Sequence, residues 1–305
     1  MTSYHLLLDT SSLLYRAFFA LPRSLTDPSG APINAVHGYL DMTARLLTDR
    51  IAPHLPDARI VHVFDHDWRP AGRVSIYPGY KAARPPDPEG LPPQFDLLRR
   101  FLRLLGMLVV EAPNWEADDA IGTLCTTAQP GDHVDIVTGD RDLLQLVRDP
   151  SADGPTVRVL FTTRGVSELK IFDATAVQAE YGVPPERYVD FAILRGDPSD
   201  GLPGVKGIGP KTARDLILRY PTLDALLDDA AAQPPRLATS LLEAQDYIAA
   251  MRLIVPVRTD ATLQSIQDAA DDAQLDELAA AHRLSGPLRR LRGAQDETMR
   301  RTSTP

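Results

Sequence analysis

Short apolar runs alternate with amphipathic stretches through the first half of the chain. The runs have the length and the branched side chains of buried strands, so we predict strands at residues 5–9, 60–65, 107–110, 134–137 and 157–161. The stretches between them have apolar residues three and four apart, so we predict helices at residues 11–20, 35–48, 93–105, from 116 onward, and 140–147. This alternation predicts an α/β fold, a doubly wound, mainly parallel sheet with helices on both faces.

The second half of the chain changes to helical patterns separated by prolines. The predicted helices span residues 174–181, 185–194, 211–219, 223–229, 236–254 and 275–291. We therefore expect a sheet domain over residues 1–170, a helical domain over 171–292 and a flexible polar tail over 293–305. Within the sheet domain, a proline-rich segment at about 69–93 has no evident core face, which is typical of a functional loop.

Composition adds limits to this picture. The chain has 305 residues, 44% of them hydrophobic and 24% charged, as in ordinary globular proteins. No apolar run reaches the length of a membrane span, and the N-terminus lacks the features of a secretory signal. The single cysteine, Cys125, excludes a disulfide framework, so we expect a cytoplasmic protein.

Carboxylates recur at the predicted strand ends and helix starts. The candidate set is Asp9, Asp65, Glu116, Asp118, Asp119, Asp140, Asp142, Asp197 and Asp200. Each acid alone has an ordinary explanation, because acids in a first turn complement the helix dipole and Asp140 suits a helix cap. Together they would meet at one edge of a parallel sheet, beyond the carboxyl ends of its strands. Oxygen ligands without His or Cys suit magnesium or manganese, so we predict a metal site.

A glycine-rich turn follows the last acid pair. Its sequence, GVKGIGPK at residues 204–211, lies between two predicted helices and has the pattern of a helix–hairpin–helix, which contacts the duplex backbone without reading bases. The candidate DNA-binding residues here are Gly204, Val205, Gly207, Ile208, Gly209 and Lys211. The turn is not a P-loop, because neither the Lys-Ser/Thr ending nor the preceding strand is in place.

The net charge of −9 argues against a nucleic-acid partner at first sight. Bound divalent ions would reverse the local sign, however. The basic residues also cluster, in one group of Arg69, Arg73, Lys81 and Arg84 and another of Lys206, Lys211, Arg214 and Arg219. Either cluster alone could be a solvated face, so this observation supports a nucleic-acid partner only alongside the acids and the hairpin.

Five segments together resemble the 5′-nuclease family, which includes the flap endonucleases and the 5′–3′ exonuclease domain of bacterial DNA polymerase I. These segments are LLLDTSSLLYRAFFALP, VFDHDWRPAGRVSIYPGYKAARPPDPE, EADDAIGTL, VTGDRDLLQLV and GDPSDGLPGVKGIGPKTA. The resemblance covers residues 4–225 and implies that all nine acids ligate two or three Mg²⁺ or Mn²⁺ ions.

The resemblance also assigns roles to the basic segment. It implies an arch that admits a 5′ single strand, with Arg73, Lys81 and Arg84 on the phosphates, Arg69 beside them, and Tyr77 or Tyr80 stacking on a base. Arg16 corresponds to the family's first-helix arginine, and Arg16, Arg73 and Lys81 are the expected catalytic residues. We also expect a K⁺ ion at the hairpin.

The expected function is a divalent-metal-dependent, structure-specific 5′-nuclease. It would act on DNA with a 5′ flap, a nick or a free 5′ end, as a cytoplasmic, nucleoid-associated monomer. The alternatives are a non-catalytic DNA-binding module and an RNA-directed nuclease of related fold. Gly201 stands where bacterial relatives commonly have asparagine. The length leads us to expect a stand-alone nuclease, and no motif for a clamp-binding tail is seen.

Overall fold

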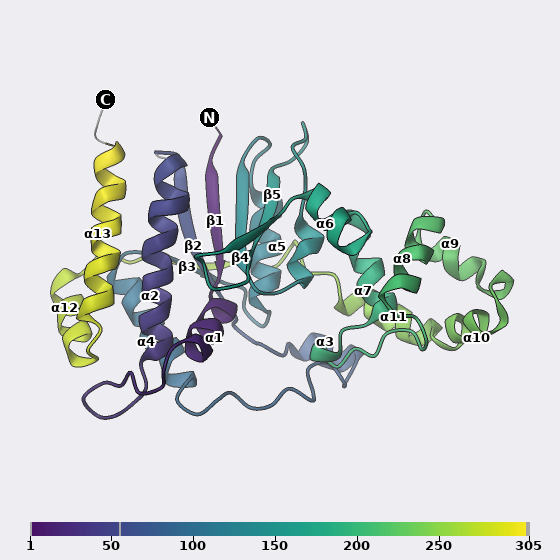
Figure 1. Cartoon of the computed structure of the whole chain (residues 1–305), viewed down its shortest axis with the longest axis horizontal. Coiled ribbons are helices and arrows are strands. Elements are labelled where there is room, and N and C mark those ends of the chain that lie inside the picture. The colour runs from purple at the N-terminus through teal and green to yellow at the C-terminus, as the bar shows by residue number, and fades with distance from the viewer. Residues whose placement is uncertain (1, 55, 303–305) are drawn as a thin grey trace.

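The computed structural model describes residues 2–54 and 56–302 and contains a seven-stranded sheet with helices on both faces (Figure 1). The strand order across the sheet is β6-β5-β4-β1-β2-β3-β7. The strands are β1 (Tyr4–Asp9), β2 (Ala58–Phe64), β3 (Leu108–Glu111), β4 (His133–Thr138), β5 (Thr156–Thr162), β6 (Leu169–Phe172) and β7 (Gln264–Ile266). The predicted doubly wound fold is confirmed.

The five predicted strands form the parallel centre of this sheet. Two antiparallel edge strands, β6 and β7, were not predicted. Strand β7 contributes only three residues, none of them fully buried, so it carries no hydrophobic alternation to detect. Pairing with β3, rather than its own pattern, makes this segment a strand.

The helices that pack on the sheet or follow it are distributed along the whole chain. They are α1 (Thr10–Ala20), α2 (Asn34–Leu46), α3 (Ala71–Ile76), α4 (Pro92–Leu104), α5 (Ala117–Thr127), α6 (Ala174–Tyr181), α7 (Tyr188–Arg195), α8 (Pro210–Arg219), α9 (Leu223–Asp228), α10 (Pro235–Glu243), α11 (Gln245–Ile254), α12 (Asp272–Ala281) and α13 (Ser285–Thr302). The helix predicted at 140–147 is instead a short 3-10 helix, Asp142–Leu146.

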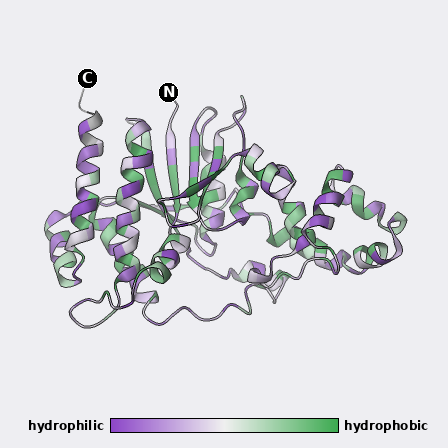
Figure 2. Ribbon diagram, viewed as in Figure 1, coloured by the Kyte–Doolittle hydropathy of each residue, from purple (hydrophilic) through white to green (hydrophobic). Residues whose placement is uncertain are grey.

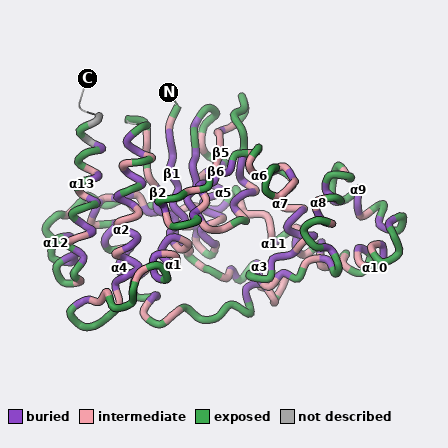
Figure 3. The backbone as a smooth tube through the Cα atoms, viewed as in Figure 1, coloured by how far each residue is buried: buried purple, intermediate pink, exposed green. Residues whose placement is uncertain are grey.

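Alternate residues of β1 feed two separate cores. Leu6 and Leu8 pack with α1, α2 and α4 on one face, whereas Leu7 packs with α5 and the segment after β4 on the other. Figure 2 shows hydrophobic residues on the central strands and mostly hydrophilic ones along α13, and Figure 3 shows the same strands buried. In a parallel sheet covered on both faces, ligands bind beyond the carboxyl ends of the strands.

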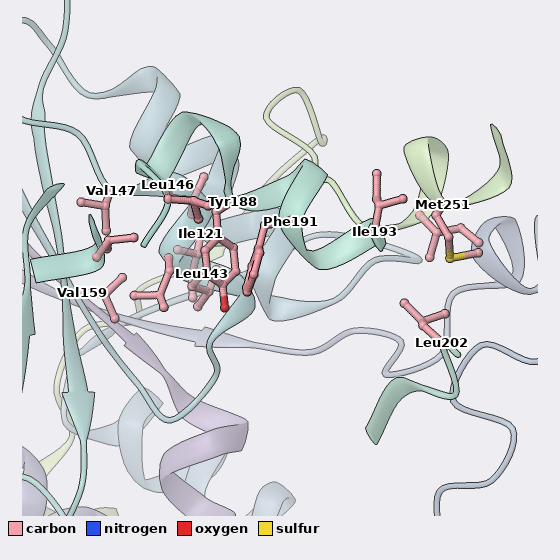
Figure 4. Packing of buried hydrophobic residues seen from close by; sticks show 14 of the residues in the cluster. Ile121, Leu143, Leu146, Val147, Val159, Tyr188, Phe191, Ile193, Leu202 and Met251 are labelled. Atoms are coloured by element: carbon pink, nitrogen blue, oxygen red, sulfur yellow. The ribbon is translucent and has the colours of Figure 1, made fainter. Parts of the chain in front are cut away.

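The core on the α5 face continues into the helical region. Figure 4 shows Ile121, Val159 and Tyr188 packed near the sheet and Ile193 with Met251 further along the same cluster. Helices α7 and α11 therefore join the hairpin region to the sheet through apolar contacts. A continuous core of this kind holds the two regions in one arrangement.

The C-terminal helices differ from the expectation. Helices α12 and α13 return to the sheet region and lie beside α4 and α2, away from α8–α10 (Figure 1). The expected flexible tail is helical as far as Thr302, and residues 303–305 lie outside the described part of the chain. Leu284, Leu288 and Leu291 are buried against the α2 side, which explains why this polar segment is ordered. The stretches 236–254 and 275–291 are each interrupted, giving two helices in place of one.

Among the described residues, no helix combines the length and the apolar character needed to cross a membrane.

Candidate active site

The first acids hold together the strand ends and helix starts at the carboxyl edge of the sheet. Asp9 ends β1, and its Oδ1 accepts a hydrogen bond of 3.1 Å from the Ser12 amide, which caps α1. Its Oδ2 accepts one of 2.6 Å from the hydroxyl of Thr138, the last residue of β4. Asp65 follows β2, and its Oδ1 accepts a hydrogen bond of 2.7 Å from the amide of Ala117, the first residue of α5.

Five of the nine carboxylates have no Lys or Arg nitrogen within 4.0 Å of their side-chain oxygens in the described part of the chain, and we call them the unpaired acids: Asp9, Asp65, Asp118, Asp140 and Asp142. Burial, together with the charges of Asp65 and Asp140, raises the pKa of Asp9 to about 7. Burial and the charges of Asp140 and Asp9 raise the pKa of Asp118 well above its usual value. The pKa of Asp142 is raised in the same way by burial and by Asp140. Each of these carboxylates therefore raises the pKa of its neighbours through its negative charge.

The other four predicted acids, Glu116, Asp119, Asp197 and Asp200, are the paired acids. Glu116 accepts hydrogen bonds from Lys81, Arg73 and the hydroxyl of Tyr80. Asp119 takes a bidentate pair from Arg73, with 2.7 Å from Nη2 to Oδ1 and 2.8 Å from Nη1 to Oδ2. Burial lowers the pKa of Arg73, but the charges of Asp119 and Glu116 outweigh it and raise that pKa overall.

The acid pair next to the hairpin is also held by basic side chains. Arg84 donates to Oδ1 of Asp200, and the Lys81 ammonium lies 4.0 Å from the other oxygen of Asp200. Asp197 caps its own turn, because its Oδ1 accepts from the Ser199 amide at 2.9 Å, and Oδ2 of Asp197 lies 3.8 Å from Arg195. The turn at 197–200 therefore joins the arch segment to the helix α7 that precedes it.

Two arch residues differ from their expected placement. Arg73 and Tyr80 are only 4% and 5% exposed and both face Glu116, so in this arrangement neither reaches a DNA strand. The Nε of Arg73 also donates to the carbonyl of Ile254 at 3.2 Å. The ring of Tyr80 is buried and its hydroxyl is bound by a carboxylate, so the stacking role expected for it stays a prediction. Arg73 joins α3, α5 and α11 here, rather than presenting its charge to solvent.

The remaining basic candidates differ in their exposure and in their hydrogen bonds. Arg69 donates to the backbone carbonyls of Tyr80 and Pro78, so it shapes the arch. Arg84 keeps 37% of its side chain exposed. Arg16 donates to the carbonyl of Thr163 at 3.0 Å, and its buried Nε has no partner among the described residues. Lys81 is buried, and Glu116 and Asp200 raise its pKa despite the opposing effect of burial.

The hairpin places only some of its amides toward solvent. The amides of Gly204, Val205 and Ile208 donate to acceptors within the protein. The amides of Gly207 and Gly209 have no acceptor within residues 2–54 and 56–302, and both residues are exposed. Of the predicted hairpin contacts, these two amides are therefore the ones open to a phosphate, at the start of helix α8.

One tyrosine links the hairpin to the arch. The hydroxyl of Tyr247, on α11, accepts a hydrogen bond of 2.9 Å from the Gly204 amide, and its ring meets Tyr77 edge-on with centroids 6.3 Å apart. Tyr77 is half-buried by this contact, whereas Lys211 is exposed on the first turn of α8. A lone tyrosine on a helix gives no sequence signal for this role, because only the fold brings α11 to the hairpin.

The acids share a small internal space. A cavity of about 20 Å³, which is room for about one water molecule, is lined by Asp118, Asp142 and Asp200 together with Arg73 and Tyr80. A larger hollow of about 250 Å³, between α4 and the β3–β7 edge, contains none of the predicted site residues. As the side chains stand, no three His, Cys, Asp or Glu residues of the described chain converge closely enough to hold a metal ion.

The chemistry of the unpaired acids nonetheless fits a hard cation. Asp118 and Asp142 accept no hydrogen bond through their carboxylates from the residues that the structure describes, and both are half-buried. Carboxylates that repel one another and lack donors are stabilised by a divalent ion.

An acid-lined sheet edge beside a helix–hairpin–helix defines a nuclease class of protein. The model of the 5'-3' exonuclease N-terminal resolvase-like domain matches residues 4–182, and that of the 5'-3' exonuclease C-terminal SAM fold matches residues 183–278. The chain belongs to the 5′-3′ exonuclease family, so the predicted family and the predicted class of enzyme are confirmed. A non-catalytic module and an RNA-directed nuclease are not favoured.

Similar proteins of comparable length include a 5'-3' exonuclease of Mycobacterium tuberculosis, which is 40% identical over 97% of this chain and 99% of the relative. A 5'-3' exonuclease of Streptomyces coelicolor is 43% identical over 94% of this chain and 98% of the relative. DNA polymerase I of Mycobacterium bovis is 44% identical over 74% of this chain, but only 24% of the polymerase is covered.

Two solved structures share the fold. The phage T5 5'-exonuclease with bound divalent zinc ions has a TM-score of 0.64 at 15% identity, over 98% of this chain and 99% of that one. The catalytic core of Rad2 in complex with DNA substrate has a TM-score of 0.57 at 16% identity, over 96% of this chain and 92% of that one.

Proposed function

We propose that the protein is a divalent-metal-dependent, structure-specific 5′-nuclease that hydrolyses DNA phosphodiesters during replication and repair, as a 5′-flap endonuclease and a 5′–3′ exonuclease. The observation that carries the proposal is the crowding of the unpaired acids beside the turn that leads into the hairpin. The acid site and the DNA-binding hairpin would then lie only a few residues apart along one segment of the chain.

The unpaired acids would hold two or three Mg²⁺ or Mn²⁺ ions. When bound, such ions supply an activated water and stabilise the charge on the leaving oxygen. The paired acids would complete the site by orienting the basic residues that bind them, and Asp200 lies at the boundary of the two groups because it shares a cavity with Asp118 and Asp142.

Lys81 would stabilise the reacting phosphate. Its ammonium contacts Glu116 and stays protonated at neutral pH, since neighbouring carboxylates raise its pKa. A positive charge fixed in a dry site costs no reorganisation when negative charge develops on the phosphate. Arg16, with one unsatisfied nitrogen at the same sheet edge, would add a second positive charge.

The DNA would be held at two places. The amides of Gly207 and Gly209 and the charge of Lys211 would bind the duplex backbone, and a K⁺ ion at the hairpin would share this phosphate contact. Arg84, whose side chain is 37% exposed, would meet the 5′ strand. Reaching the acids requires fraying of the terminal base pair, at a cost of a few kcal/mol.

The relatives support this substrate assignment. Similar chains are named 5'-3' exonuclease, and the Rad2 catalytic core was solved with DNA substrate. We propose that this chain acts on DNA with a 5′ flap, a nick or a free 5′ end, as a monomer near the nucleoid.

The test is cleavage of a 5′-labelled DNA flap by the pure protein with Mg²⁺, with Mn²⁺ and with EDTA, with nicked, gapped and RNA-flap duplexes alongside. We expect metal-dependent cutting near the junction of the DNA flap and weaker cutting of the RNA flap. Cutting that persists in EDTA, or no cutting of any of these DNA substrates with either metal, would overturn the proposal.

A further inference from the structure

Gly201 lies against the backbone of the arch. It ends the turn at 197–200 in the left-handed region, with φ of +73°. A Cβ atom on Gly201 would lie 2.4 Å from the carbonyl oxygen of Gly79, a distance that real Cβ contacts do not show. The obstacle is backbone, which cannot turn aside as a flexible side chain can. In this arrangement the position accepts only glycine, for its backbone angle and for the space beside it.

The close contact between the turn and the arch also fixes the backbone of Lys81. Its amide donates a hydrogen bond of 2.8 Å to the carbonyl of Asp200, the residue just before Gly201. Lys81 itself has a φ of +52°, which is rare for a residue with a side chain. Such a conformation costs about 1–3 kcal/mol and persists only where the surroundings impose it. Here the contact between 79–81 and 200–201 imposes it.

The conformation of Lys81 decides where its ammonium lies. From this left-handed position the side chain enters the acid site, where it contacts Glu116 and lies 4.0 Å from Asp200. The side chain is only 8% exposed. An asparagine at 201 would tolerate the left-handed backbone, but its Cβ would force the segment at 79–81 away from the turn.

We propose that Gly201 is a positioning residue for Lys81. Because Gly201 has no Cβ, the arch can pack against the turn at 197–200, and this contact places the Lys81 ammonium in the acid site. The inference rests on the proposed function for the role of Lys81 in cleavage. Glycine at 201 is then a requirement of the contact between the arch and the turn at 197–200.

The first test compares Gly201→Ala with Gly30→Ala. Gly30 also has a left-handed φ, of +89°, but nothing lies within 4 Å of its Cβ position. Both variants bear backbone strain, and only Gly201→Ala adds the clash. In single-turnover cleavage of the 5′ flap we expect the rate of Gly201→Ala to fall roughly 10–100-fold with little change in flap affinity, because small misplacements of a catalytic group are costly. Gly30→Ala should stay within about twofold of the parent. Equal rates for the two variants would overturn the inference.

The second test asks whether the effect passes through Lys81. In a Lys81→Ala background, Gly201→Ala should cost no further activity, because the group it positions is gone. Losses that multiply would show that the substitution acts by general distortion, and would sink the proposal.

The third test does not depend on cleavage. An amine-reactive reagent followed by mass spectrometry measures how fast Lys81 is modified, with the exposed Lys206 and Lys211 as internal references. We expect Lys81 to be protected in the parent and in Gly30→Ala, and to react several-fold faster in Gly201→Ala. Unchanged protection in Gly201→Ala would overturn the inference even if the parent cuts no DNA, whereas an inactive parent with the expected labelling would count against the proposed function alone.

Discussion

The unpaired and the paired acids lie side by side and yet face different electrostatic environments. Neither Asp118 nor Asp142 forms an ion pair with a described residue, and burial and the neighbouring carboxylates raise the pKa of both against the opposing charges of Lys81 and Arg195. Asp119 and Glu116 are more deeply buried, but Arg73 satisfies them. The unpaired acids therefore repel one another in a way that a cation can relieve. The paired acids form a complete ion-pair network that holds α3, α5 and α11 together.

The largest effect should come from breaking the paired group. Arg73→Met leaves Asp119 and Glu116 buried with one partner fewer, which should lower the free energy of unfolding by about 3–5 kcal/mol. Arg84→Met is the control, because its side chain is 37% exposed and its loss should cost about 1 kcal/mol or less. Urea denaturation of both variants measures the difference. Equal shifts of the midpoint would mean that the two ion pairs are equivalent and the comparison fails.

Removing an unpaired acid should affect activity instead. Asp118→Ala should lower flap cleavage roughly 10²–10³-fold, as the loss of one stabilising element of the transition state does. Duplex binding in a gel-shift assay should be unchanged, because the hairpin lies outside the acid site. Asp276→Ala, on the exposed face of α12, is the control and should cut normally. Weakened duplex binding in Asp118→Ala would show that this acid contributes to folding or to DNA binding rather than to catalysis.

Metal binding should stabilise the protein in a pH-dependent way. Protons and Mg²⁺ compete for carboxylates with raised pKa values, among them Asp9 with a pKa of about 7. At pH 8 and a Mg²⁺ concentration about 100-fold above Kd, the gain should be about 2.7 kcal/mol, or several degrees in Tm. At pH 5 the gain should be much smaller. Calorimetric melts with and without Mg²⁺ measure it, and an equal gain at both pH values would contradict a site built from these acids.

The smallest effect concerns the electrostatic repulsion among the unpaired acids. Asp142→Asn should stabilise the metal-free protein at pH 8, because it removes a buried carboxylate that its neighbours repel. A carboxylate whose pKa rises on folding destabilises the fold above its unfolded pKa, and this cost grows as the pH rises toward the folded value. The stabilisation should therefore vanish near pH 4. The same substitution at the paired Asp119 should destabilise the protein at pH 8. Destabilisation by Asp142→Asn would show that Asp142 is satisfied like the paired acids.

Much of the fold was predictable because it rests on local patterns. The five central strands have apolar runs that only a buried sheet accommodates, and Asp9 and Asp65 stand at the ends of two of them. The edge strands β6 and β7 were not predictable, because their register comes from a neighbouring strand. The return of α13 to α2 was also missed, since a mostly polar helix shows little of where its few leucines will pack.

The candidate site divides in the same way. Arg73, Lys81 and Tyr80 were singled out from the sequence as residues for DNA, and the fold turns all three inward onto Glu116. Tyr247 was not singled out at all, although it joins the hairpin to the arch. The charge and type of each residue are known from the sequence, but the direction in which its side chain points depends on the packing around it.

The sheet, the acids at its carboxyl ends and the hairpin could be predicted from local patterns, because strand ends and glycine turns are local properties of the chain. Which acids are paired could not be predicted in this way. Pairing depends on contacts between segments far apart in the chain, such as Arg73 with Asp119 and Gly201 with Gly79. These contacts form only when packing of the core brings the arch, α5 and the turn at 197–200 together.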